Sequence, residues 1–301
     1  MRIVSLLPAA TEIACALGLA DSLVGVSHDC DHPPEICHLP RVTSTRFPEG
    51  LTSEEIHRTV RGSITRRESL YSVDIGKLAA LQPDLVLAQR QCSVCAVGEA
   101  DAARALGLAG VSANLWALEA SRFREMPDDI RRLGEATRHE TRAQALIGQL
   151  NARLEQARRE TTRASRPRVF CLSWFNPLMA AGHWETEMVE LAGGEDGLGM
   201  RGETSNPLGL EKLKAYAPEV ILLMPCGFTQ KRTREEWEAV RHQPLWRNLP
   251  AVQSGMVFIV DGSLFHRPGP RLIDGVELLA SLLHPEIGIN ARHQASAQKV
   301  A

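Results

Sequence analysis

One segment of the chain occurs twice. Residues 77–87 read KLAALQPDLVL, and residues 212–222 read KLKAYAPEVIL. In each copy an amphipathic stretch ends near a proline, which cannot continue a helix, and an acidic residue then leads into branched apolar residues. Such an apolar run is typical of a buried parallel strand. The repeat therefore predicts two similar lobes, each with a helix that leads into a parallel sheet.

The beginnings of the two halves also correspond. Residues 2–6 (RIVSL) resemble residues 168–172 (RVFCL), and each run is followed by a proline, a helix and a helix-ending glycine, Gly18 in the first half and Gly193 in the second. Glycine is favoured at that position because it adopts left-handed backbone angles. We therefore expect an α/β fold of two Rossmann-like lobes, with the ligand cleft between them.

A single long helix is expected to join the lobes. From about residue 139 to residue 162, Ala145, Leu146, Leu150 and Leu154 recur at helical spacing among charged residues. Such a helix would span roughly 36 Å at 1.5 Å per residue. We expect a first lobe over residues 1–120, a connecting helical segment over 121–166, a second lobe over 167–288 and a disordered tail over 289–301. Residues 48–71 form an insertion in the first lobe, with a charged helical piece at residues 52–56 and a turn at Gly62.

The composition limits the classes of partner. The 301 residues are 44% hydrophobic, and 34 Lys and Arg nearly balance 36 Asp and Glu. The arginines alternate with acidic residues, so the sequence does not favour a nucleic-acid partner. No apolar stretch has the length needed to insert into a bilayer. The chain starts directly on an apolar run with the features of a strand and without those of a signal peptide, which predicts a cytoplasmic location, or a periplasmic one if the natural N-terminus is longer. We expect a monomer.

Polar and aromatic residues follow the predicted strands at their carboxyl ends. Ligands of open parallel α/β sheets bind at that edge. Aromatic faces, amides, carboxylates and soft metal ligands together suit a large amphipathic ligand that contains a metal. The residues expected to contact the ligand are Asp29, Cys30, His32, Gln91, Cys92, Trp174, Phe175, His183, Trp184, Cys226, Phe265, His266 and Arg267.

Three cysteines offer a second interpretation. Cys92 and Cys95 form a CxxC pair, and Cys30 lies in another of the loops expected at the cleft. Zinc sites and thiol-redox sites use such pairs, although a four-ligand zinc site normally has a second paired element. The alternative function is therefore a zinc-binding or thiol-redox protein with a metal held by Cys30, Cys92 and Cys95.

The motifs of common enzyme classes are absent from the sequence. The GxSxG elbow, the GxxxxGK[ST] phosphate loop and the HExxH zinc motif do not occur. A dinucleotide fold would also need glycines in the first strand-to-helix turn, where the chain has residues 7–10, LPAA. We therefore expect a binding protein rather than an enzyme, and no required cofactor.

Four of these segments resemble a known family. The segments are residues 2–12, residues 24–34, residues 81–86, and residues 265–271, which read FHRPGPR. At these positions the chain is similar to the substrate-binding proteins of siderophore, haem and cobalamin ABC transporters, and most closely to the cobalamin-binding branch. The resemblance covers about residues 2–285.

The resemblance implies a ligand and a partner. It implies two lobes held by one backbone helix, with cobalamin or a related corrinoid in the cleft, contacted by loops that include Asp29, Gln91, Cys92, Trp174 and residues 263–267. It also implies docking of an ABC-transporter permease at Glu211. A cytosolic corrinoid carrier or sensor remains open, as does binding of haem or a siderophore, although the cleft loops lack the arginine cluster that suits an anionic siderophore.

Overall fold

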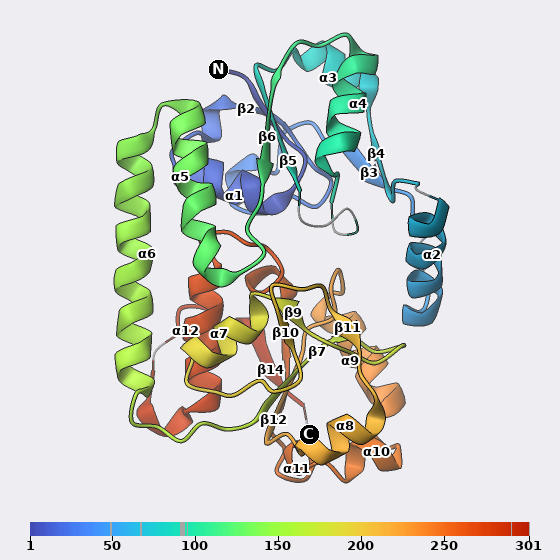
Figure 1. Cartoon of the computed structure of the whole chain (residues 1–301), viewed down its shortest axis with the longest axis vertical. Helices are drawn as coiled ribbons and strands as arrows, with labels where there is room; N and C mark the ends of the chain where they lie inside the picture. The colour runs from blue at the N-terminus through green and yellow to red at the C-terminus, as the bar shows by residue number, and fades with distance from the viewer. Residues whose placement is uncertain (49, 67, 91–93, 95, 290, 301) are drawn as a thin grey trace. The chain divides into compact units, whose positions relative to one another are not determined.

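The computed structural model of the chain describes residues 1–48, 50–66, 68–90, 94, 96–289 and 291–300. The chain divides into two compact units, which we describe separately (Figure 1). Lobe 1 comprises Met1–Ala120 and Glu125–Gly148, and lobe 2 comprises Ser121–Arg124 and Gln149–Ala301. Each lobe has its own sheet with parallel strands and with helices beside it, as the repeat predicts.

Lobe 1 contains a four-stranded parallel sheet in the order β2-β1-β5-β6 and a separate antiparallel pair, β3-β4. Its helices and strands are β1 (Ile3–Ser5), α1 (Pro8–Ala16), β2 (Leu23–Val26), β3 (Thr43–Thr45), α2 (Ser53–Arg66), β4 (Tyr71–Val73), α3 (Ile75–Leu81), β5 (Leu85–Gln89), α4 (Glu99–Ala109), β6 (Asn114–Leu118) and α5 (Met126–Thr137).

Lobe 2 contains a six-stranded sheet in the order β11-β8-β7-β12-β13-β14, in which β7, β12 and β13 are parallel. Its helices and strands are β7 (Val169–Trp174), β8 (Met179–Ala180), β9 (Gly182–His183), α7 (Glu185–Leu191), β10 (Met200–Arg201), β11 (Asn206–Pro207), α8 (Leu210–Tyr216), β12 (Val220–Leu223), α9 (Gln230–Val240), α10 (Pro244–Arg247), α11 (Pro250–Gln253), β13 (Val257–Val260), α12 (Leu272–Leu283) and β14 (Ala297–Lys299).

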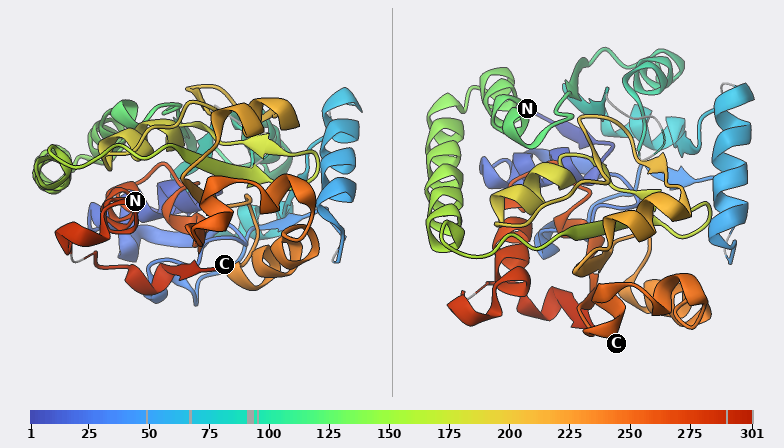
Figure 2. Two further views of the ribbon diagram at one scale, coloured as in Figure 1. Left: turned by 90° about the horizontal axis from the view of Figure 1, so that it is seen from below. Right: turned by 60° about the horizontal axis from the view of Figure 1, so that its bottom comes forward.

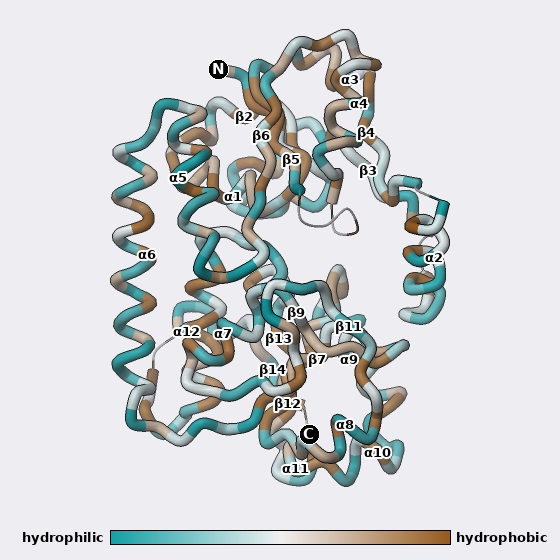
Figure 3. Tube along the Cα trace, in the orientation of Figure 1, coloured by the Kyte–Doolittle hydropathy of each residue, from teal (hydrophilic) through white to brown (hydrophobic). Residues whose placement is uncertain are grey.

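Helix α6 (Glu140–Thr161) runs through the boundary between the two units, so residues of both lobes belong to it. Its buried positions Ala143, Ile147, Leu150 and Ala157 recur at helical spacing. The remaining surface is largely hydrophilic (Figure 3). This pattern is that of a helix with one face on protein and the rest in water. Of the residues expected on that face, Leu150 is buried, whereas Ala145 is exposed and Leu146 and Leu154 are half-buried, so the buried stripe differs from the predicted one.

The duplicated segment has the same local structure in both lobes. In lobe 1, α3 ends at Gln82, whose φ of 40° is left-handed, and in lobe 2, α8 ends at Ala217, whose φ is 49°. A proline follows each residue, and the chain then enters the strand that pairs in parallel with the first strand of its lobe, β5 with β1 and β12 with β7. The helix-to-strand unit predicted from the repeat is therefore present twice.

The core of lobe 2 lies between the sheet and the helices on one of its faces (Figures 1 and 2). Phe170 and Leu172 of β7 alternate inward toward Trp237 of α9 and Trp246 of α10, whose rings meet edge to face with centroids 5.3 Å apart. Helices α7 and α12 pack against each other, and α7 also packs on β7. These helices hold the strands in place. The loops at the carboxyl ends of the strands therefore remain available for other contacts.

The insertion of lobe 1 differs from the prediction. The expected turn at Gly62 is wrong, because α2 continues through it from Ser53 to Arg66. A reciprocal capping box starts the helix: the Thr52 N–H donates to Glu55 Oε2 (2.8 Å), and the Glu55 N–H donates to Thr52 Oγ1 (3.3 Å). Two satisfied backbone donors at the start outweigh a single interior glycine, which costs about 1 kcal/mol.

The expectation of a disordered tail is also wrong for residues 297–299. They form β14, which pairs antiparallel with β13, and the Val300 N–H donates to the Val257 carbonyl (2.8 Å). Val300 is 4% exposed and belongs to the lobe 2 core. The segment is ordered because its backbone pairs with the edge of β13. Its polar composition does not reveal this pairing.

Candidate functional site

The loop after β2 carries the first predicted contact residues. Asp29 is exposed and lies beside His28, whose Nε2 is 3.5 Å from Asp29 Oδ2. His28 is fixed from two sides: its Nδ1 is 2.7 Å from Thr43 Oγ1, and its ring tilts against Tyr71 with centroids 5.6 Å apart. This network holds the loop so that the Asp29 carboxylate faces solvent at the carboxyl edge of the lobe 1 sheet.

The other two residues of this loop differ in exposure. Cys30 is 1% exposed, and its Sγ is 3.1 Å from the hydroxyl of Thr11 in α1. Arg41 donates to the Cys30 carbonyl (2.6 Å) and so anchors the backbone there. His32 is half-buried. Burial of Cys30 gives it a role in supporting the loop.

Three predicted residues, Gln91, Cys92 and Cys95, lie outside the described residues. Within the described residues, no three His, Cys, Asp or Glu side chains gather in a way that would hold a metal ion. The metal site of Cys30, Cys92 and Cys95 therefore stays a prediction.

A charged network, absent from the sequence prediction, follows β5 and β6. Arg90 donates to Glu99 Oε2 (2.7 Å) and also pairs with Glu119. Asp129, 1% exposed, accepts the backbone N–H of Glu119 and of Ala120 (2.8 Å to its Oδ2). Burial raises the pKa of Asp129 to about 6, against the opposing effect of these hydrogen bonds. Asp129 lies in α5, so the network fixes the backbone at the end of β6 through this helix. No local sequence signal reveals the position of α5.

An aromatic pair lies at the carboxyl ends of β7 and β12 in lobe 2. The rings of Trp174 and Phe228 meet at 61° with centroids 5.1 Å apart, and Trp174 Nε1 donates to the Asn176 carbonyl (3.0 Å). The guanidinium of Arg232 in α9 lies 3.6 Å from the centre of the Phe228 ring. Cys226, an exposed cysteine outside any disulfide, belongs to the same loop as Phe228. We call Trp174, Phe228 and Arg232 the aromatic platform. The sequence prediction included Trp174 and omitted the other two.

A buried ion pair lies beside this loop. His266 Nδ1 is 3.0 Å from Glu185 Oε1, and His266 Nε2 is 2.6 Å from the Met224 carbonyl. Both neighbours are acceptors, so both ring nitrogens donate and the imidazole carries a proton on each. Burial opposes the charged form, but the hydrogen bond that His266 donates to Glu185 and the negative charge of Glu185 outweigh burial and raise the pKa of His266 to about 9. His266 thus ties the end of β12 to the start of α7.

The remaining predicted residues of lobe 2 are buried or half-buried. Trp184 is 5% exposed and donates from Nε1 to the Phe265 carbonyl, while His183, with a left-handed φ of 45°, stacks on Trp184. Phe265 is fully buried, and Phe175 belongs to the hydrophobic core. Arg267 is half-buried. The structure therefore brings His266, Phe265 and Trp184 together and makes the two phenylalanines supports for the loops.

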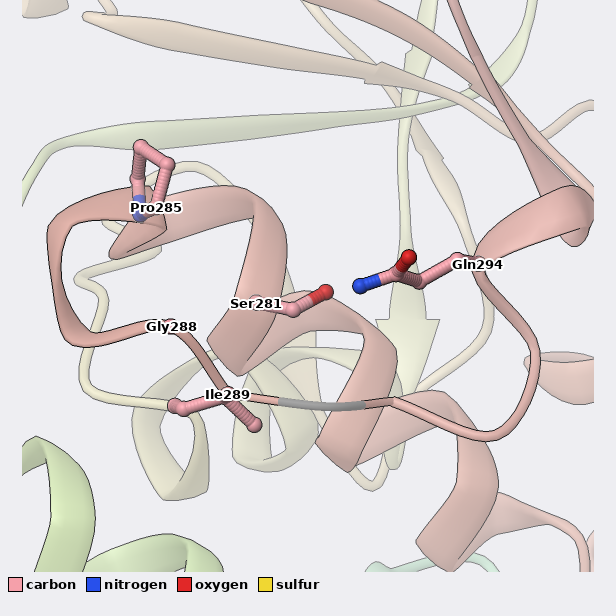
Figure 4. A pocket seen from close by; sticks show the side chains of 5 residues that line it. All are labelled: Ser281, Pro285, Gly288, Ile289 and Gln294. Carbon is pink, nitrogen blue, oxygen red and sulfur yellow. The ribbon is translucent and has the colours of Figure 1, made fainter.

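Two pockets of lobe 2 lie elsewhere. Figure 4 shows one, at the end of α12, where the Ser281 hydroxyl and the Gln294 amide point toward each other beside Pro285, Gly288 and Ile289. A second lies between α8, α10 and α11, lined by Leu245 and its neighbours. None of the predicted contact residues lines either pocket.

Glu211 lies in the first turn of α8, exposed, and pairs with Lys214 (2.7 Å).

Across the part of the chain that the structure describes, we find no helix with the length and apolar character required to span a membrane.

Two lobes built from the same unit, with ordered polar and aromatic loops at the carboxyl edges of their sheets, define the class of two-lobed solute-binding proteins. A family model described as "Periplasmic binding protein" matches residues 3–264, and the chain belongs to this family. The family consists of solute-binding proteins rather than enzymes. They bind a small-molecule ligand and work with a permease.

Individual relatives agree with this assignment. A vitamin B12-binding protein of Vibrio cholerae serotype O1 is 27% identical over 285 residues, which cover 94% of this chain and 88% of that protein. The structure of the periplasmic vitamin B12 binding protein BtuF of Vibrio cholerae matches with a TM-score of 0.64 at 23% identity, covering 96% of this chain and 98% of that one.

A periplasmic haem-binding protein of Pseudomonas aeruginosa is similar in fold to the same degree, with a TM-score of 0.72 at 21% identity, covering 100% of this chain and 98% of that one. The fold alone thus does not separate the two ligands. The named relatives with a stated location are periplasmic, so the predicted cytoplasmic location gains no support from them.

Proposed function

We propose that the protein reversibly binds cobalamin or a related corrinoid in a cleft between its lobes, and delivers it to the permease of an ABC transporter. The observation that carries the proposal is the aromatic platform of Trp174, Phe228 and Arg232 at the carboxyl edge of the lobe 2 sheet. A corrin is a large ring with a fringe of amides, so aromatic faces and hydrogen-bonding groups are the contacts that suit it. The name of the Vibrio cholerae relative supports the same ligand.

Each lobe contributes a different kind of contact to this proposal. In this proposal Asp29 in lobe 1 and Arg267 in lobe 2 hydrogen-bond the amide fringe, and Gln91 and Cys92 add to the lobe 1 side. Trp174 and Phe228 offer apolar ring surface to the corrin. His183, Trp184 and His266 hold the lobe 2 loops in place, with Cys226 at their margin.

The direct test is a spectral titration of the purified full chain with cyanocobalamin and cobinamide, repeated by calorimetry. We expect saturable one-to-one binding in the micromolar range or tighter. Failure of both compounds to bind at tens of micromolar would overturn the proposal.

Variants connect binding to the aromatic platform. Trp174→Ala and Arg232→Ala should each weaken corrinoid binding about tenfold or more, which corresponds to about 1.4 kcal/mol. Arg234→Ala is the matched control, because Arg234 is exposed two residues further along α9 and hydrogen-bonds Gln298 (2.6 Å) instead. Equal affinities for all three variants and the wild type would remove the platform from the site.

Haem is the second candidate ligand, favoured by the haem-binding structural neighbour and by the cation at the platform. Haem carries two carboxylates that an arginine pairs with well. Competition between haemin and cyanocobalamin ranks the two. Haemin binding that cyanocobalamin does not displace would transfer the proposal to haem.

The permease partner is proposed to meet acidic residues on both lobes. Glu211 is one of them. In the repeat, Gly76 of lobe 1 corresponds to Glu211, and Asp74 lies two residues before it. Asp74 caps α3 and pairs with Lys77 (3.2 Å). Opposite charges on a partner mainly accelerate association. Glu211→Lys and Asp74→Lys should therefore abolish ligand uptake by cells while leaving ligand affinity unchanged. Cell fractionation distinguishes a cytoplasmic from a periplasmic location, and light scattering tests the expected monomeric state.

A further inference from the structure

Several buried polar atoms of lobe 2 have no hydrogen-bond partner among the described residues, and two of them lie beside Gly199. They are Oδ2 of Asp196, a residue 8% exposed, and Oγ1 of Thr186, a residue 2% exposed. The other carboxylate oxygen of Asp196 is satisfied, because it accepts the backbone N–H of Leu198 and of Gly199, each at 3.0 Å. Buried polar groups normally find a partner, so two such atoms in one place call for a ligand.

The two atoms face the same small space. A methyl group placed on Gly199 would lie 2.7 Å from Asp196 Oδ2, 3.1 Å from Thr186 Oγ1 and 2.9 Å from the Ala181 carbonyl oxygen. The Ala181 carbonyl accepts the Met200 N–H at 3.3 Å and keeps a second lone pair. Three oxygens from three separate segments therefore converge beside Gly199, where any other residue would crowd them.

The local charge is negative and unbalanced. Glu185, next to Thr186, is paired with His266, but no Lys, Arg or His of the described chain pairs with Asp196. Burial, with the nearby Glu185 charge, raises the pKa of Asp196 to about 6, against its two backbone hydrogen bonds. The other titratable groups that sense this carboxylate are Cys171 and Tyr216, and burial raises the pKa of both thiol and phenol, so both are neutral at pH 7.5.

We propose that Asp196, Thr186 and the Ala181 carbonyl bind a monovalent alkali cation, Na⁺ or K⁺. The three ligands are hard oxygens, which suit such ions and not transition metals. The one unpaired carboxylate gives the site a charge of −1, which a monovalent ion neutralises without excess. A bound ion would also fix the turn between Ala181 and Glu185, which carries His183 and Trp184, so it would order the lobe 2 side of the proposed ligand site without depending on which ligand binds there.

The test is thermal unfolding of the full chain in NaCl, KCl or choline chloride at equal ionic strength. At pH 7.5 and a cation concentration about 100 times Kd, Tm should rise by roughly 5 °C or more over choline. At pH 4.5 the rise should vanish, because Asp196 is then protonated and does not attract the ion. Equal Tm values in all three salts at pH 7.5 would overturn the proposal, and so would stabilisation by Ca²⁺ alone.

Variants locate the ion. Asp196→Asn, Thr186→Val and Gly199→Ala should each abolish the cation response, whereas Gly209→Ala should keep it, since a methyl there meets no atom within 4 Å. A crystal soaked in Tl⁺ gives a direct result that does not depend on any variant folding. We expect an anomalous peak in contact with Asp196 Oδ2 and Thr186 Oγ1, and an ordered water without anomalous signal at that position would contradict the proposal.

Discussion

The imidazole of His266 donates from Nδ1 to Glu185 Oε1 at 3.0 Å, across 81 residues of chain. Neither side chain has a strong local signal in the sequence, yet together they hold the loop after β13 against the start of α7. The same imidazole donates to the Met224 carbonyl at the end of β12. One protonated side chain therefore joins three segments at the carboxyl edge of the lobe 2 sheet.

This ion pair predicts a pH dependence of stability. The folded-state pKa of His266, about 9, is above the usual value of 6.5, so its contribution is complete below pH 6.5 and is lost as the pH rises through 9. The full effect is on the order of 3 kcal/mol. Urea unfolding of the wild type and of Glu185→Gln at pH 6 to 9.5 measures it. The decrease of the unfolding free energy with rising pH should be smaller in Glu185→Gln and should persist in Glu235→Gln, an exposed control. An unchanged pH dependence in Glu185→Gln would contradict the assignment.

Asp129 should stabilise the end of β6 in lobe 1. Its carboxylate accepts two backbone N–H groups and pairs with Arg132 (2.7 Å), so Asp129→Ala leaves buried donors unsatisfied and should cost about 1–3 kcal/mol. The neighbouring Asp128→Ala should cost much less, because Asp128 is exposed. Trp116, which lies in lobe 1 beside Arg132, reports the unfolding by fluorescence. Equal losses in the two variants would remove the special role of Asp129.

The edge-to-face tryptophans of lobe 2, Trp237 and Trp246, give a prediction about packing. Trp237 is fully buried, and its Nε1 has no partner among the described residues. Trp237→Ala should therefore cost about 3–5 kcal/mol through the cavity it leaves, whereas Trp237→Phe keeps an aromatic ring, removes the unsatisfied N–H and should cost about 2 kcal/mol or less. Calorimetric Tm values compare them. A loss of stability for Trp237→Phe as large as that for Trp237→Ala would contradict the prediction.

The C-terminal strand should protect the edge of lobe 2. Ending the chain before Ala297 removes β14 and the buried Val300, so the amides of β13 should exchange with solvent faster and the truncated protein should aggregate more readily. Val300→Ser should reproduce part of the loss, and Lys299→Ala, on an exposed residue, should not. Hydrogen exchange followed by mass spectrometry is the measurement, and unchanged protection of β13 would refute the prediction.

Local patterns were sufficient for the elements of both lobes. The helix, left-handed residue, proline and buried strand at residues 75–89 and 210–223 depend on neighbours in the chain, which is why the repeat predicted them. The same patterns failed at Gly62, where a capping box ten residues earlier decided the outcome, and at residues 297–299, whose order comes from the edge of β13.

The site divides in the same way. Loops after predicted strands identified Asp29, Trp174 and His266, because chain order alone places the carboxyl ends of parallel strands at one edge of a sheet. Whether a side chain there faces solvent or the interior was decided by packing: Phe265 is buried while Asp29 is exposed. Glu185 becomes the partner of His266, and Trp174 the neighbour of Phe228, only when segments distant in sequence meet. The sequence by itself determined the class of fold and the edge of each sheet that bears the loops, since both follow from hydrophobic periodicity. The tertiary structure decided the partners of each polar group, since burial and charge balance depend on contacts that no local pattern contains.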